Sequence, residues 1–136
     1  MTGSGRVLVP VNFRLGAEEA GYIVADSGAS LLLVDPELDD RLATVTAPHR
    51  VVMDGEADAE MFAPAEREVE WPGVGEEAPA TINYTSGTTA APKGVVLSQR
   101  SLWLNAVTGA WTFGVGPGDR YLHTLPICHV NGWGMP

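Results

Sequence analysis

The chain has 136 residues, of which 45% are hydrophobic, and its formal net charge at pH 7 is −9. This composition is typical of one α/β globular domain and excludes a disordered protein. No apolar run reaches the roughly 20 residues that span a bilayer, and no basic stripe exists to bind nucleic acid. The N-terminus lacks a signal-peptide pattern and the single cysteine forms no internal disulfide, so we expect a cytoplasmic protein.

Short apolar segments alternate with helical ones over residues 1–54. In chain order we expect a strand at 7–9, a helix at 17–27 ended by Gly28, a strand at 31–34, a helix at 36–43 and a strand at 50–53. One face of the first helix carries Ala20, Ile23, Val24 and Ser27. This β-α-β-α-β order predicts an α/β fold with a parallel sheet and helices packed on it.

Residues 55–79 are acidic and show little periodicity, so we expect a surface excursion with one helical turn near 59–62. A strand at 80–83 and a second at 95–97 flank a polar loop. Ser98 is expected to cap a helix over 99–110, and 120–125 is expected to be the last strand. In residues 78–136 Asp119 is the sole acidic residue, which makes this half better suited to bind an anion.

The loop between these two strands has the chemistry of a polyphosphate site. Residues 84–94 read YTSGTTAAPKG, with four hydroxyl side chains, two glycines and one lysine. Hydroxyls and exposed backbone N–H groups donate to phosphate oxygens, and a lysine adds a compact positive charge. The alternative is a Walker loop, but Pro92 replaces its second glycine and Gly94 replaces its magnesium-binding hydroxyl, so we reject it.

This loop resembles the phosphate-binding signature of the adenylate-forming enzymes, [YF]-T-S-G-[TS]-T-G-x-P-K-G, and departs from it at Ala90. Residues 7–15, 22–29 and 125–132 resemble further family elements; the last reads LPICHVNG and favours an acyl- or aryl-CoA ligase. The resemblance implies a partial, mostly parallel sheet with flanking helices, an incomplete piece of the family's large domain. It assigns ATP phosphate binding to Thr85, Ser86, Gly87, Thr88, Thr89 and Lys93, and a substrate channel or gate to His129, Gly132 and Trp133.

By this resemblance the chain is a fragment of an ATP-dependent acyl-CoA synthetase, with ATP, Mg²⁺, coenzyme A and a fatty or aryl carboxylic acid as cofactors and substrates. The family's adenine-binding, magnesium-binding and lid elements have no counterpart in these residues, and we expect no catalytic or metal-ligating side chain. Alone, the chain is expected to bind nucleotide weakly and to self-associate through exposed sheet edges. The alternative is a non-catalytic remnant or interaction module derived from such a ligase.

Overall fold

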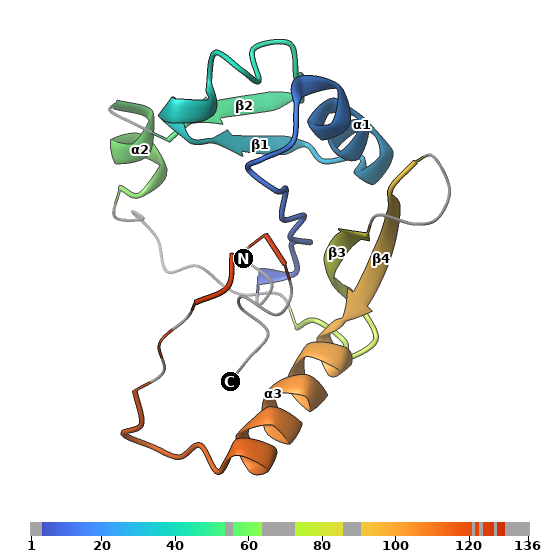
Figure 1. Ribbon diagram of the computed structural model, residues 1–136, viewed down its shortest axis with the longest axis vertical. Helices are drawn as coiled ribbons and strands as arrows, with labels where there is room; N and C mark the ends of the chain where they lie inside the picture. Colours follow the sequence, from blue (N-terminus) through green and yellow to red (C-terminus); the bar gives the residue numbers. More distant parts are fainter. Residues whose placement is uncertain are drawn as a thin grey trace. The chain divides into compact units, whose positions relative to one another are not determined.

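We analysed a computed structural model that describes residues 4–53, 56–63, 73–85, 91–120, 122, 124–126 and 128–129 (Figure 1). The chain forms two compact units. One contains Val11–Glu70, and the other combines Met1–Pro10 with Trp71–Pro136. No helix in the described part of the chain is long and apolar enough to cross a membrane.

The unit Val11–Glu70 is built on two parallel strands. Its elements in order are α1 (Ala17–Ser27), β1 (Leu31–Val34), the 3₁₀ helix η2 (Pro36–Leu38), β2 (His49–Val52) and α2 (Glu56–Met61). Strands β1 and β2 pair in parallel from Leu31↔His49 to Val34↔Val52. The expected strands and the short helix after residue 55 are thus present, each within a few residues of its predicted position.

Helix α1 has the predicted bounds because local signals mark both of its ends. The Glu19 carboxylate accepts a hydrogen bond from the Gly16 N–H at 3.2 Å, which satisfies a free donor of the first turn. At the other end Gly28 has φ 65°, a left-handed conformation, and its N–H donates to the Ala25 carbonyl. Ala20 and Val24 are buried in the core with Val34, Leu42 and Val45.

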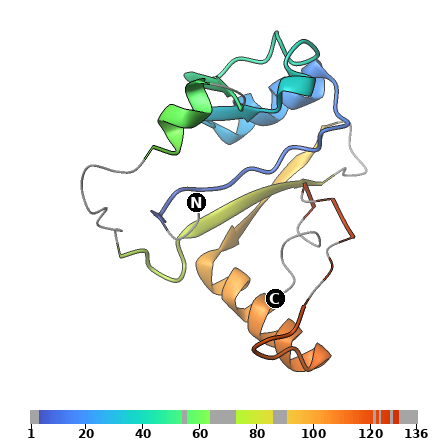
Figure 2. The same cartoon turned by 90° about the vertical axis from the view of Figure 1, so that its left-hand side faces the viewer.

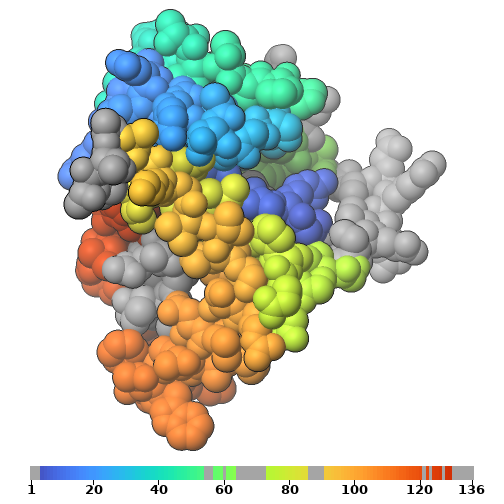
Figure 3. All heavy atoms as spheres, turned by 90° about the vertical axis from the view of Figure 1, so that its right-hand side faces the viewer, coloured from blue at the N-terminus to red at the C-terminus, as the bar shows by residue number. Residues whose placement is uncertain are grey.

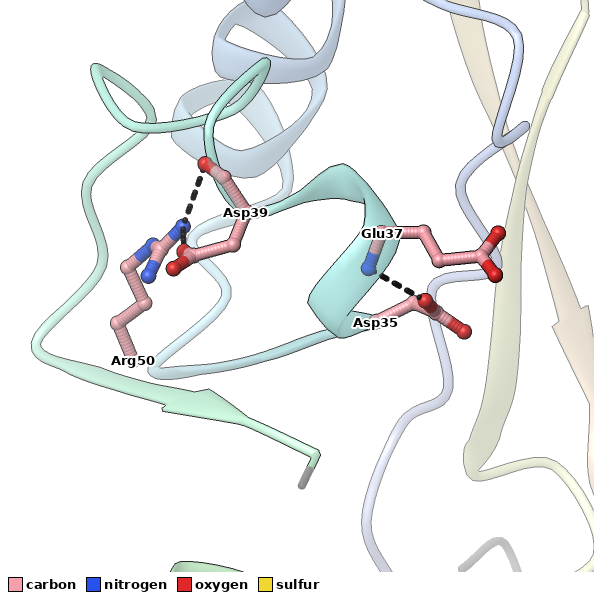
Figure 4. Close-up of polar contacts among 4 residues, drawn as sticks. All are labelled: Asp35, Glu37, Asp39 and Arg50. Carbon is pink, nitrogen blue, oxygen red and sulfur yellow. Dashed lines mark hydrogen bonds and ion pairs between the residues drawn. The ribbon is translucent and has the colours of Figure 1, made fainter. Parts of the chain in front are cut away.

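The helix predicted over residues 36–43 is wrong, because only Pro36–Leu38 is helical and turns follow it. Asp35 starts this short element by accepting the Glu37 N–H at 2.9 Å (Figure 4). Arg50 on β2 then binds the Asp39 carboxylate at 2.6 Å and fixes the turn onto the strand. The turns bring Leu42 and Val45 into the core. A helix continued through residue 43 would not place both side chains there.

The second unit contains the hairpin of β3 (Pro79–Thr85) and β4 (Lys93–Ser98), followed directly by α3 (Gln99–Phe113). The hairpin is antiparallel. The N-terminal segment, drawn in blue, runs beside β3 (Figure 2). There Leu8 donates to the Ala80 carbonyl and accepts from the Ile82 N–H in a single parallel bridge. The expected strand at 7–9 is therefore one bridge that pairs with β3, since Pro10 has no N–H with which to extend the ladder.

Helix α3 begins at the predicted cap and runs three residues beyond the predicted end. The Ser98 hydroxyl accepts the Ser101 N–H at 3.2 Å, and Gly114 at φ 65° ends the helix. The strand expected at 120–125 is not formed by Arg120, Leu122, Thr124 or Leu125, the residues of that range that the structure describes. None of these four residues pairs with a described strand, and a strand without a ladder partner is not stable. The α/β class and parallel pairing with flanking helices are confirmed.

Candidate phosphate-binding site

The β3–β4 hairpin brings the two ends of the predicted phosphate loop together. Thr85 is the last residue of β3, Lys93 is the first of β4, and the two form a directly opposed pair of the ladder. Both side chains are exposed. The remaining predicted ligands, Ser86, Gly87, Thr88 and Thr89, lie outside the described residues. The structure therefore shows the base of the loop, and at that base it places a threonine opposite a lysine.

Opposed residues of a ladder share a face of the sheet, and successive residues of a strand alternate between faces. Thr85 and Lys93 therefore lie on the same face as Thr81 and Asn83 of β3. The Asn83 amide donates to the Thr81 hydroxyl at 2.9 Å, and its Oδ1 atom is buried without a hydrogen-bond partner among the described residues. A row of polar side chains thus leads along β3 to the base of the loop.

The opposite face of the hairpin is apolar. On this face the Ile82 and Tyr84 side chains lie unusually close to the Gly94 backbone. Tyr84 lies opposite Gly94, and Ile82 lies opposite Val96. A Cβ atom placed on Gly94 would lie 2.9 Å from Ile82 Cγ2 and 3.2 Å from Tyr84 Cζ. The Tyr84 ring consequently covers the backbone of Gly94, where a side chain has no room. This pair was not predicted from the sequence; its signal is a glycine inside a strand next to the loop.

Lys93 is available to an anionic ligand. It forms no ion pair with any residue in the described ranges, where the two ion pairs are Arg50–Asp39 and Arg100–Glu76. Arg100 at the start of α3 is thus paired with an acidic side chain, whereas Lys93 has no such partner among the described residues. A lysine beside N–H and hydroxyl donors is suited to binding phosphate oxygens.

The predicted channel residues are only partly described. His129 is exposed, and its backbone N–H donates to the Pro126 carbonyl at 3.1 Å in a turn. No hydrogen bond or ion pair joins His129 to Thr85 or Lys93 in the described part of the chain. Gly132 and Trp133 lie outside the described residues.

A shallow apolar hollow of about 600 Å³ lies at the C-terminal end of α3. Its lining consists of Val107, Ala110, Trp111, Gly114 and Val115. Since a helix rises about 1.5 Å per residue, Trp111 lies roughly 20 Å along α3 from the Ser98 cap. None of the residues that line the hollow belongs to the predicted phosphate loop. The described residues also contain no group of three or more histidine, cysteine or acidic side chains that could hold a metal ion.

Comparison with known proteins identifies the family. A family model described as AMP-binding enzyme matches residues 2–136. The chain is 39% identical over 140 residues to an indoleacetate–CoA ligase of Aromatoleum aromaticum, covering 94% of this chain and 27% of that protein. It is 33% identical over 159 residues to a peroxisomal butyrate–CoA ligase of Arabidopsis thaliana, covering 96% and 27%.

Solved structures give the same result. ATP-bound MatB from Rhodopseudomonas palustris matches with a TM-score of 0.78 and 28% identity, over 93% of this chain and 26% of that one. The o-succinylbenzoate–CoA synthetase of Bacillus subtilis, in complex with its acyl-adenylate intermediate, matches with a TM-score of 0.73 and 30% identity over 91% and 31%. The fold is thus part of an adenylate-forming ligase domain. The chain belongs to the AMP-binding enzyme family, and it spans about a quarter of the length of the curated relatives it matches.

Proposed function

We propose that this chain is part of an ATP-dependent acyl-CoA ligase and that its loop between β3 and β4 binds the phosphates of ATP. The observation that carries this proposal is the opposed pair of Thr85 and Lys93 at the base of the loop, in a chain of this family. Both side chains are exposed, and the lysine has no ion-pair partner in the described part of the chain, which supports contact with an incoming polyphosphate.

In the proposed reaction a carboxylate oxygen attacks the α-phosphorus of ATP, and the bond to the β,γ-pyrophosphate breaks. Negative charge builds up on the leaving pyrophosphate, and donors placed beforehand around it stabilise the transition state. We assign this role to Thr85, Ser86, Gly87, Thr88 and Thr89 as donors, with Lys93 supplying the charge. The thiol of coenzyme A would then attack the acyl carbonyl of the adenylate and release AMP.

Magnesium enters this proposal only with the nucleotide. The described residues offer no cluster of three metal-binding side chains, so the part of the chain that the structure describes does not fit a resident metal ion. Mg²⁺ prefers phosphate oxygens and water in such sites, and it commonly arrives already bound to ATP. We therefore assign no step to a metal held by this chain.

For the acid substrate we propose a fatty or aryl carboxylic acid, because two of the relatives are named for butyrate and for indoleacetate. His129, Gly132 and Trp133 are the proposed channel or gate residues for this acid. The cytoplasm stays our predicted compartment, although one of these relatives is named as peroxisomal.

The test is carboxylate-dependent exchange of labelled pyrophosphate into ATP, with Mg²⁺ and a panel of short, medium and aromatic acids. Adenylation by this chain would give exchange with at least one acid and a loss of roughly a hundredfold in Lys93→Ala, the usual cost of removing one transition-state donor. Arg120→Ala is the matched control, since it removes an exposed positive charge outside the loop. Exchange that is absent with every acid, from folded protein, contradicts adenylation by this chain.

A second candidate function, a non-catalytic interaction module, is favoured by one observation. Helix α3 has no buried residue, and Trp103 and Trp111 are 64% and 87% exposed. In Figure 3 the atoms of α3, in orange, lie at the surface. Recovery of a stable complex with another protein without nucleotide, together with no pyrophosphate exchange, would support this function over the first.

A further inference from the structure

Gly94 is required by space rather than by backbone conformation. Among the described glycines, positive φ angles occur at Gly5, Gly28, Gly114 and Gly118, and Gly94 is not one of them. Any residue could adopt its backbone angles. A Cβ atom there would nevertheless lie 2.9 Å from Ile82 Cγ2 and 3.3 Å from the Tyr84 hydroxyl oxygen, and the first of these distances is shorter than real Cβ contacts allow.

This close contact distinguishes the observed register of the hairpin from shifted registers. Gly94 is the sole glycine of β4, whose sequence is KGVVLS. If β4 slipped by one residue, Lys93 or Val95 would lie under the Tyr84 ring; a slip by two in one direction would bring Val96 there. Each of these residues carries a Cβ atom where the ring now lies. Each of these slips would therefore require the Tyr84 ring or the Ile82 side chain to move.

That register determines where the cation stands. Tyr84↔Gly94 is the neighbour of Thr85↔Lys93 in the ladder, one step from the loop. At the end of the hairpin far from the loop, the ladder shifts register between Pro79 and Thr81. Pairing at that end therefore does not determine which residues oppose one another next to the loop. A one-residue slip would also move the Lys93 side chain to the opposite face of the hairpin.

We propose that Tyr84 and Gly94 are positioning residues: the tyrosine ring packed on the bare glycine backbone locks the register that holds Lys93 opposite Thr85 at the base of the phosphate loop. This inference rests on the proposed phosphate binding for its functional consequence. Its structural part, the lock itself, is independent of any ligand. The two parts therefore need separate measurements on the same variants.

The structural measurement is nuclear magnetic resonance of the whole chain. In the unmodified protein the Tyr84 ring should shift the Gly94 Hα signals upfield, and cross-strand contacts should join residues 85 and 93. Gly94→Ala should abolish the 85–93 contacts. Tyr84→Leu should do the same without introducing a clash, which keeps the test valid if the alanine variant does not fold. Tyr84→Phe keeps the ring and should keep the contacts. Retained 85–93 contacts in both Gly94→Ala and Tyr84→Leu would overturn the proposal.

The functional measurement is a titration with pyrophosphate. Gly94→Ala and Tyr84→Leu should weaken its binding by roughly tenfold or more, because Lys93 would leave its place opposite Thr85 and a charge-assisted hydrogen bond to pyrophosphate would be lost. Tyr84→Phe should restore binding relative to Tyr84→Leu. Gly21→Ala is the matched control, because a Cβ there has no atom within 4 Å and Gly21 lies in α1, in the other unit. If the unmodified chain does not bind pyrophosphate, the proposed phosphate binding is contradicted. The magnetic resonance measurement of the 85–93 contacts still tests whether Tyr84 and Gly94 hold the register. Unchanged affinity in both altered-register variants would overturn the positioning role.

Discussion

Arg100 binds Glu76 through both its side chain and its backbone. The guanidinium Nη1 lies 3.1 Å from Glu76 Oε2, and the Arg100 backbone N–H donates to the Glu76 carbonyl at 2.8 Å. The neighbouring Gln99 N–H donates to the Ala78 carbonyl at 3.0 Å. These bonds connect the segment before β3 to the first turn of α3, whose N–H groups have no partner within the helix. The stem of the hairpin is thereby closed at the end opposite the phosphate loop.

The ion pair should contribute little to stability, because both side chains are more than half exposed. A double-mutant cycle of Arg100→Gln and Glu76→Gln should give a coupling free energy of about 0.2–1 kcal/mol that falls as salt is added. The backbone bonds remain in every variant, so each should still fold. Chemical denaturation measures the free energies of unfolding. A coupling well above this range that persists in high salt would show that the pair is not the exposed contact described here.

Two glycines of one helix should respond to the same substitution with opposite signs. Gly21→Ala, inside α1 with no atom within 4 Å of a new Cβ, should raise the free energy of unfolding by up to about 1 kcal/mol. Gly28→Ala, at the left-handed C-terminal position with φ 65°, should lower it by about 1 kcal/mol. Thermal unfolding of the two variants measures both changes. Equal effects of the two alanines would contradict the cap geometry of α1.

Leucines in the core and at the surface of the same unit provide a second matched comparison. Leu42 is 9% exposed and belongs to the core cluster, whereas Leu31 on β1 is 44% exposed. Leu42→Ala should lower the free energy of unfolding by about 2–5 kcal/mol, the cost of a cavity. Leu31→Ala should cost less than about 1 kcal/mol. Denaturant unfolding separates the two, and a similar loss in both variants would show that residues 39–44 do not pack as described.

Where local chemistry decides an element, the sequence predicted it closely. The bounds of α1 follow from apolar spacing and from the stop at Gly28, and the start of α3 follows from the Ser98 cap. The element after Asp35 was predicted as a helix because a proline stands in its first turn. What shortens it is the requirement that Leu42 and Val45 reach a core formed by residues distant in sequence, and local patterns do not contain that information.

The candidate site likewise has one part that the sequence predicted and one part that it did not. The order of hydroxyls, glycines and lysine in the loop identified Thr85 and Lys93, and the structure places them opposite each other. The contact between Tyr84 and Gly94 depends on which strand residues oppose one another, and that register cannot be read from either strand alone. The pairing of Leu8 with β3 was missed for a similar reason, since about seventy residues of the chain separate the two partners.

The most direct test of the central claim, that the loop between β3 and β4 binds the phosphates of ATP, is a titration of the isotope-labelled chain with Mg²⁺–ATP followed at each backbone amide. We predict saturable shifts concentrated at Thr85, Lys93 and the loop between them, strongly weakened in Lys93→Ala and preserved in Arg120→Ala. Shifts that lie elsewhere in the chain, or that are unchanged in Lys93→Ala, would contradict the claim.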